Sequence, residues 1–150
     1  ETLTVFAFWF FNQEEVDIAI METGLGGRLD SVTACVPVVT VITKIALDHV
    51  EILGNSLEKI TIEKAGILKK GVACISAYQE ASATEVLIEE ANKKETPIQF
   101  VNGERYSEFQ LNIQGKSQQE NAQLTVSALS LLKDFNISEK MIIDGLKSVK

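Results

Sequence analysis

The sequence predicts a layered α/β domain in which a mostly parallel sheet is flanked by helices. Short apolar runs rich in β-branched residues alternate along the chain with longer amphipathic segments, a pattern typical of α/β folds. The chain has 150 residues, of which 45% are hydrophobic, and this size suits one domain with a sizeable core. The runs that predict buried strands are residues 17–21, 38–42, 72–76 and 97–101.

Helical segments lie before and between these strands. The dense aromatic stretch over residues 2–13 stops at polar residues, which predicts the end of a buried helix. Ser117 followed by Glu120 is a capping-box signature, which predicts a helix to about Leu132. Further helices are expected from Asn55 or Ser56 to about Lys69, before Gly71, then over residues 81–94, and from Ser138 onward; residues 103–115 are expected to be irregular, with a short edge strand at 109–113.

Charge and cysteine content exclude several classes of protein. With 14 basic and 21 acidic residues the net charge is −7, which argues against non-specific binding to nucleic acid or an anionic membrane. The longest apolar run, residues 5–11, is too short to span a bilayer. Cys35 and Cys74 form no CxxC pair and no disulfide framework. We therefore expect a reducing, cytoplasmic location.

Two loops are candidates for a functional site, because ligands in open α/β sheets bind at the carboxyl ends of strands. Glu22 follows the first predicted strand directly, where a carboxylate either holds magnesium beside phosphates or is an ordinary polar residue. His49 and Asp48 follow the second strand. His49 is the only histidine in the sequence, which excludes a zinc site with several histidine ligands. The role of His49 is either structural or functional. If the two strands are neighbours, Glu22 and His49 converge on one crevice.

The loop after Glu22 is rich in glycine. Gly24, Gly26 and Gly27 lack the full spacing of a dinucleotide-binding fingerprint, and they allow either a close backbone approach to a ligand or a tight turn. Arg28 beside them is either an anion ligand or a side chain that faces solvent.

Lys64 lies on the apolar face of its predicted helix, four residues after Ile60 and three before Ile67. A lysine in that position extends its ammonium to solvent, pairs with an acid or has a special chemical role. Gln118 and Asn121, three residues apart, share one face near the start of another predicted helix. Their amides either contact a nucleotide or are solvated, and the residues alone favour solvation.

Four segments taken together resemble folylpolyglutamate synthase, including its bifunctional dihydrofolate synthase form, in the Mur ligase superfamily. They are METGLGGRLD (21–30), VITKIALDHVEILG (41–54), LEKITIEKAGI (57–67) and QQENA (118–122). The resemblance implies an ATP-dependent amide-bond ligase. In such enzymes ATP phosphorylates a carboxylate, and the amine of an incoming glutamate attacks the acyl phosphate.

The resemblance also implies roles for individual residues and a set of ligands. ATP and magnesium are the implied cofactors, and folate or dihydropteroate and L-glutamate are the implied substrates of a monomeric cytoplasmic enzyme. The implied magnesium ligands are Glu22, His49 and a carbamylated Lys64, with His49 and Lys64 also catalytic; the implied substrate loop is Gly24, Gly26, Gly27, Arg28 and Asp30; and the implied nucleotide contacts are Asn121 and Gln118.

The chain departs from the family pattern at several positions. Thr33 stands where the family has an asparagine, Ser117 where it often has histidine, and Lys44 where it has a small polar residue. No GxxxxGK[ST] phosphate loop occurs in residues 1–150, and the chain begins inside an aromatic run without a start methionine. We therefore expect residues 1–150 to be part of the central ATP-binding domain of a Mur-type ligase, and to be inactive by themselves.

Two alternatives remain open. Another Mur-type ligase could act on a cell-wall precursor, although the GLGGRLD loop favours the folate branch. The chain could also be a non-catalytic nucleotide-binding or interaction module. The presence of Glu22, His49 and Lys64 together argues against such a module, because a degenerate copy need not keep all three.

Overall fold

The computed structural model describes residues 1–102, 111–113 and 115–149, and it contains a three-stranded parallel sheet. The strands are β1 (Thr40–Ile42), β2 (Cys74–Ala77) and β3 (Ile98–Val101), in the order β1-β2-β3. Ser76 lies opposite Ile42 on one side and Phe100 on the other. The predicted α/β class is confirmed, and the last three predicted strands form close to their expected positions.

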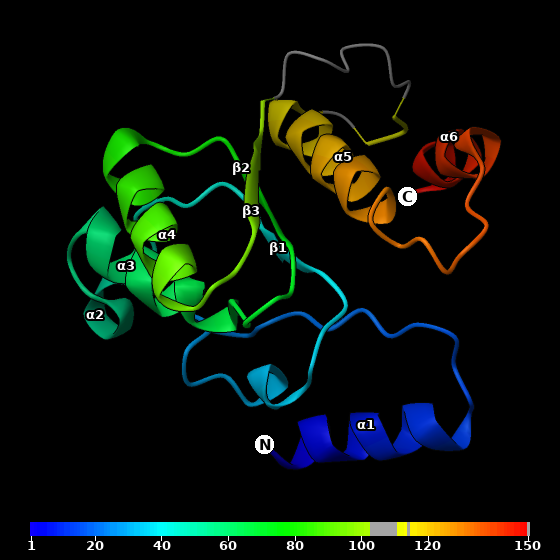
Figure 1. The fold of residues 1–150 in the computed structure, drawn as a ribbon, viewed down its shortest axis with the longest axis horizontal. Coiled ribbons are helices and arrows are strands. Elements are labelled where there is room, and N and C mark those ends of the chain that lie inside the picture. The colour runs from blue at the N-terminus through cyan, green and yellow to red at the C-terminus, as the bar shows by residue number, and fades with distance from the viewer. Residues whose placement is uncertain (103–110, 114, 150) are drawn as a thin grey trace.

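Helices cover both faces of this sheet (Figure 1). Helices α3 (Leu57–Lys64) and α4 (Ala81–Lys93) pack together on one face, and α5 (Lys116–Leu129) packs on the other. Successive side chains of a strand point to opposite faces. Cys74 accordingly joins the core beneath α3 and α4, whereas Ile75 and Ala77 join the core beneath α5. Every residue of β2 is buried because the strand is central and covered on both sides.

Shorter elements connect or follow these layers. The helix α6 (Glu139–Ser148) begins where predicted, since the Ser138 hydroxyl accepts a hydrogen bond from the Met141 N–H. In the described part of the chain, no helix has the length and apolar character needed to cross a bilayer. The remaining elements are α2 (Val50–Leu53) and the 3₁₀ turns η1 (Ser31–Ala34) and η2 (Ala65–Ile67).

The strand predicted over residues 17–21 is wrong. This segment has no regular secondary structure, and the side chains of Ile18 and Ile20 are 44% and 92% exposed. A parallel strand is stabilised by hydrogen bonds to its neighbours and by cover on its faces. No described residue pairs with this segment, so its apolar composition is not sufficient to make it a strand.

The helix predicted at the start of the chain is confirmed as α1 (Thr2–Gln13), but its predicted burial is wrong. None of its residues is buried, and Phe6 and Trp9 are each more than half exposed. In Figure 1 the helix lies apart from the sheet. A hydrogen bond of 2.6 Å joins its Thr4 hydroxyl to the hydroxyl of Ser31. Its aromatic rings contact each other instead, with the Phe6 and Trp9 centroids 5.7 Å apart.

Two helix boundaries also differ from expectation. Helix α5 begins at Lys116 after Gly115, so Ser117 lies inside the helix and the predicted capping box does not form. Helix α3 is capped by Ser56 as predicted, but its α-helical turns end at Lys64 and continue as η2 rather than reaching Lys69. The irregular region 103–115 falls mostly outside the described residues; the described residues 111–113 carry no strand.

Candidate functional site

The segment from Gly24 to Asp30, here called the glycine loop, packs against the C-terminal end of α3. A Cβ atom on Gly27 would lie 2.9 Å from the carbonyl oxygen of Glu63 and 3.0 Å from that of Lys64. On the other side of the contact, a Cβ on Gly66 would lie 2.1 Å from the Cα of Arg28. Glycine is therefore needed at both positions, because the two backbones touch. Close approach to the helix, rather than to a ligand, accounts for these glycines.

Arg28 fixes this contact through three hydrogen bonds to one residue. Its backbone N–H donates to the Glu63 carbonyl at 2.8 Å, and its Nε and Nη2 donate to Glu63 Oε1 at 3.0 and 2.9 Å. The backbone bond supplies a partner to a carbonyl near the helix end, where such partners are scarce. The Arg28 guanidinium is thus paired with a carboxylate and does not simply face solvent.

Asp30 organises the other end of the glycine loop. Its Oδ2 accepts hydrogen bonds from the N–H groups of Gly24 and Leu25 at 2.8 and 3.3 Å, and its Oδ1 caps η1 by accepting from Val32 at 2.9 Å. Partial burial tends to raise the pKa of Asp30, but these three N–H donors together lower it below its usual value. The carboxylate is therefore held in its charged form as the structural centre of the loop.

Lys64 is the last residue of α3 and borders the glycine loop. The apolar stripe around it is confirmed, since Ile60 and Leu68 are buried and Lys64 itself is half-buried. Its backbone carbonyl lies against Gly27. No side chain or carbonyl in the described ranges accepts a hydrogen bond from its ammonium. The structure therefore brings Lys64 and the glycine loop together.

Glu22 and His49 are both exposed. His49 precedes α2 in a left-handed conformation, with φ 49° and ψ 38°, and its Nε2 lies 3.7 Å from the Asp48 carboxylate. Helix α2 packs on α3, and its Leu53 is the nearest neighbour of a Cβ built on Gly26. Across residues 1–102, 111–113 and 115–149, no three His, Cys, Asp or Glu side chains gather as a metal-binding group. Carboxylate oxygen suits magnesium, but these residues do not complete a metal site.

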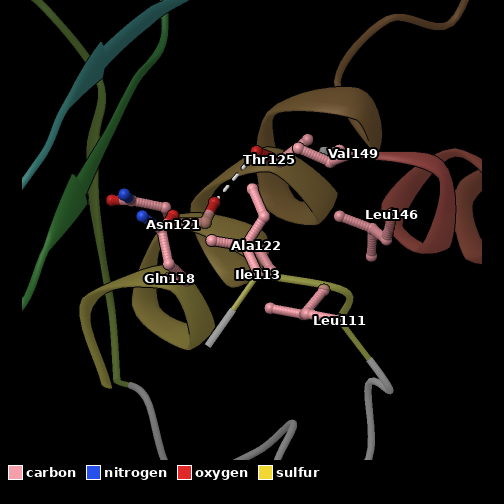
Figure 2. Close-up of a pocket in the computed structure, with 8 residues that line it drawn as sticks. All are labelled: Leu111, Ile113, Gln118, Asn121, Ala122, Thr125, Leu146 and Val149. Atoms are coloured by element: carbon pink, nitrogen blue, oxygen red, sulfur yellow. Dashed lines mark hydrogen bonds between the residues drawn. The ribbon is translucent and has the colours of Figure 1, made fainter. Parts of the chain in front are cut away.

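Gln118 and Asn121 lie in the first turns of α5, on the face of the sheet opposite to α3 and the glycine loop. Both border a depression of about 140 Å³ whose other lining is mostly apolar, including Leu111 and Leu146 (Figure 2). In Figure 2 the two amides project away from these apolar side chains. The depression is smaller than the 300–1,000 Å³ typical of ligand pockets. It does not by itself form a nucleotide site.

Gln79, just after β2, was not singled out by the sequence. Its side chain is 2% exposed; Oε1 accepts from the Ile45 N–H at 2.9 Å, and Nε2 donates to the Thr43 carbonyl at 2.9 Å and to Ser76 Oγ at 3.2 Å. It thereby fixes the loop that leaves β1 and leads toward His49. Its position at the carboxyl end of a buried strand is the signal that could have identified it.

A family model described as the Mur ligase middle domain matches residues 2–138. A dihydrofolate synthase/folylpolyglutamate synthase of Bacillus subtilis is 35% identical over 97% of this chain and 40% of its own length. A folylpolyglutamate synthase of Arabidopsis thaliana is 42% identical over 86% of this chain and 23% of its own length. The chain thus spans about two fifths of the length of the B. subtilis relative and less than a quarter of the length of the plant relative.

Solved structures show the same fold. The Mycobacterium tuberculosis folylpolyglutamate synthase complexed with ADP superposes with a TM-score of 0.89 and 26% identity, over 99% of this chain and 39% of that one. A structure described as an FPGS–AMPPCP–folate complex superposes with a TM-score of 0.87 and 26% identity, over 96% of this chain and 41% of that one. The family model covers most of the described fold, and the chain belongs to the Mur ligase middle-domain family.

Proposed function

We propose that this chain acts as part of the central ATP-binding domain of a longer ATP-dependent ligase that adds glutamate to a folate. The observation that carries the proposal is the 35% identity, over 97% of the chain, to the B. subtilis dihydrofolate synthase/folylpolyglutamate synthase. The complexes with ADP, AMPPCP and folate among the related structures support ATP and folate as ligands. We extend the proposal to dihydropteroate and L-glutamate as substrates of a monomeric cytoplasmic enzyme.

The proposed reaction has two steps. The terminal phosphoryl group of ATP passes to a carboxylate oxygen of the folate, and ADP leaves. The amine of glutamate then attacks the acyl phosphate, so that an amide forms, a proton is released and phosphate departs. Phosphoryl transfer depends mainly on positioning and on neutralising charge. Magnesium, when bound, would neutralise charge on the phosphates.

We assign roles to the residues on this basis. Glu22 and His49 would contribute magnesium ligands, and Lys64, as a carbamate, would contribute an anionic oxygen. The support for Lys64 is its half-buried place on an apolar stripe, beside the glycine loop and without an acceptor in the described ranges. The glycine loop, with Gly24, Gly26, Gly27, Arg28 and Asp30, would border the folate, and Asn121 and Gln118 would contact the nucleotide.

ADP release by the full-length protein tests the activity. We expect release that requires ATP, a folate and glutamate together, and none from residues 1–150 alone, because this segment lacks a phosphate loop. Release with a cell-wall precursor in place of folate would assign a different ligase. Nucleotide binding without release under either condition would indicate a non-catalytic module.

Substitution of Lys64 tests the proposed site. Lys64→Ala should abolish ADP release and leave the melting temperature unchanged, since no described residue accepts a hydrogen bond from its ammonium. Lys59→Ala is the matched control, because Lys59 lies on the same helix but is exposed, and its ammonium donates a hydrogen bond to the Asn55 side chain at 3.3 Å. Full activity of Lys64→Ala would remove this residue from the mechanism.

A further inference from the structure

We propose that Arg28 is a positioning residue: through Glu63, it holds the glycine loop on α3 beside Lys64. The inference rests on the proposed function for its kinetic readout, but its structural part does not. It differs from a role in which Arg28 itself binds an anionic substrate.

The first argument is that the contacts of Arg28 converge on one residue. Its backbone N–H and two atoms of its guanidinium all donate to Glu63, at 2.8, 3.0 and 2.9 Å. The Glu63 side chain is only 22% exposed, whereas that of Arg28 is 55% exposed. A mostly covered carboxylate is costly without a donor, so loss of the ion pair would be less favourable for Glu63 than for the more exposed Arg28. If Arg28 turned to a substrate anion, it would leave this carboxylate unpaired.

The second argument is the place of this pair relative to Lys64. Gly27 lies against the carbonyls of Glu63 and Lys64, and Gly66 lies against the backbone of Arg28. Lys64 therefore lies between two backbone contacts, the one at Gly27 and the one at Gly66, and the Arg28–Glu63 pair holds both of them in place. The carboxylate adjacent in sequence is occupied by Arg28, and no described acceptor holds the ammonium of Lys64. The pair thus fixes the loop while leaving the Lys64 side chain available.

Charge exchange in the full-length protein separates the two roles. The variants are Arg28→Glu, Glu63→Arg and the double exchange Arg28→Glu/Glu63→Arg. The matched control exchanges Lys70 and Glu95, an exposed pair 2.7 Å apart that joins the turn after η2 to the turn before β3. Arg28→Gln removes the ion pair without adding repulsion. It therefore tests the proposal even if the charge-reversed single variants do not fold.

We expect each charge-reversed single variant to lose about tenfold in kcat, because an ion pair is replaced by repulsion. KM for ATP should stay unchanged, and the double exchange should restore kcat to within about threefold of the parent protein. Arg28→Gln should lose about fivefold, and the Lys70/Glu95 exchange nothing. If Arg28 binds substrate directly, KM for the folate rises in every Arg28 variant and the double exchange does not rescue it. That outcome overturns the proposal.

Hydrogen exchange of residues 24–30, measured on the same purified proteins, keeps the proposal independent of the assigned activity. Exchange should be faster in Arg28→Glu and in Arg28→Gln, and return to the parent rate in the double exchange. Parent protein without folate-dependent ADP release would refute the proposed function and leave this test intact. Unchanged exchange in the single variants would refute the inference even if the parent protein is an active ligase.

Discussion

At the residue scale, the buried amide of Gln79 connects the loops that leave β1 and β2. We expect Gln79→Leu to lower the free energy of unfolding by about 2 kcal/mol, because the buried Ile45 N–H loses its acceptor and cannot reach water. Urea denaturation measures the change. Gln99→Leu is the control: this glutamine is exposed on β3, so its substitution should change the free energy by less than about 0.5 kcal/mol. Equal effects would show that the hydrogen bonds of Gln79 contribute nothing specific.

A second prediction at this scale concerns acid. The pKa of Asp30 in the folded chain lies below its usual value of 3.8, so the charged carboxylate favours the folded state. The stabilisation is fully present above about that pH and is lost as the pH falls through the lowered folded value. Asp30→Asn should therefore be less stable than the parent chain at pH 7, with a difference that shrinks toward pH 3.

The chemical reason is that an amide NH₂ replaces one carboxylate oxygen and cannot accept the Gly24, Leu25 and Val32 bonds together. Denaturant titrations at several pH values measure the difference. Asp17→Asn, at an exposed aspartate, is the control and should show no such trend. A pH-independent difference between Asp30→Asn and the parent would indicate that the charge of Asp30 is irrelevant to the loop.

At the element scale, the contact between the glycine loop and α3 depends on the lack of a side chain. Gly66→Ala should destabilise the chain by about 3 kcal/mol, because the new Cβ would lie 2.1 Å from the Cα of Arg28 and backbone would have to move. Gly145→Ala is the matched control in α6, where a Cβ meets no atom within 4 Å. It should stabilise the chain by about 0.5–1 kcal/mol through helix propensity. Thermal unfolding of the two variants should therefore shift in opposite directions.

Elements whose pattern is local were predictable from the sequence, and contacts between elements were not. β2 and α4 formed as expected because the apolar residues that define each pattern lie within a few residues of each other. Residues 17–21 have the same apolar character, but strand formation needs a partner that composition does not reveal. The close approach of Gly27 and Gly66 joins segments far apart in the chain, so no spacing rule indicates it.

In the candidate site, too, features with a local pattern were predictable and contacts between distant segments were not. Lys64 was identified by its helical stripe, and the structure places it beside the glycine loop. The expected meeting of Glu22 and His49 depended on a strand that does not form, and the described residues gather no metal-binding group. The Arg28–Glu63 pair and Gln79 were missed because their partners lie about 35 positions away in the sequence.

At the scale of the whole molecule, α1 presents aromatic side chains to solvent. We expect residues 1–150 by themselves to self-associate through this helix, because contiguous exposed apolar surface favours association. Phe6→Glu/Trp9→Glu should lower the mass measured by sedimentation to that of a monomer, and change the unfolding free energy by less than about 0.5 kcal/mol. Asn12→Glu, which adds charge at an exposed polar position of the same helix, should leave the mass unchanged. A monomeric parent chain at high concentration would contradict the prediction.

The two free cysteines lie in parts of the molecule that open by different routes. Cys74 is buried in the central strand, so a thiol reagent can reach it only when the sheet separates. Burial also raises the pKa of its thiol to about 11, which lowers the fraction of reactive thiolate. Cys35 ends η1 and is half-buried next to the turn that Asp30 caps. Labelling of Cys35 therefore reports local opening near the glycine loop, whereas labelling of Cys74 reports global unfolding. The labelling rates of the two cysteines would therefore measure local opening and global unfolding separately, in the same unmodified sequence.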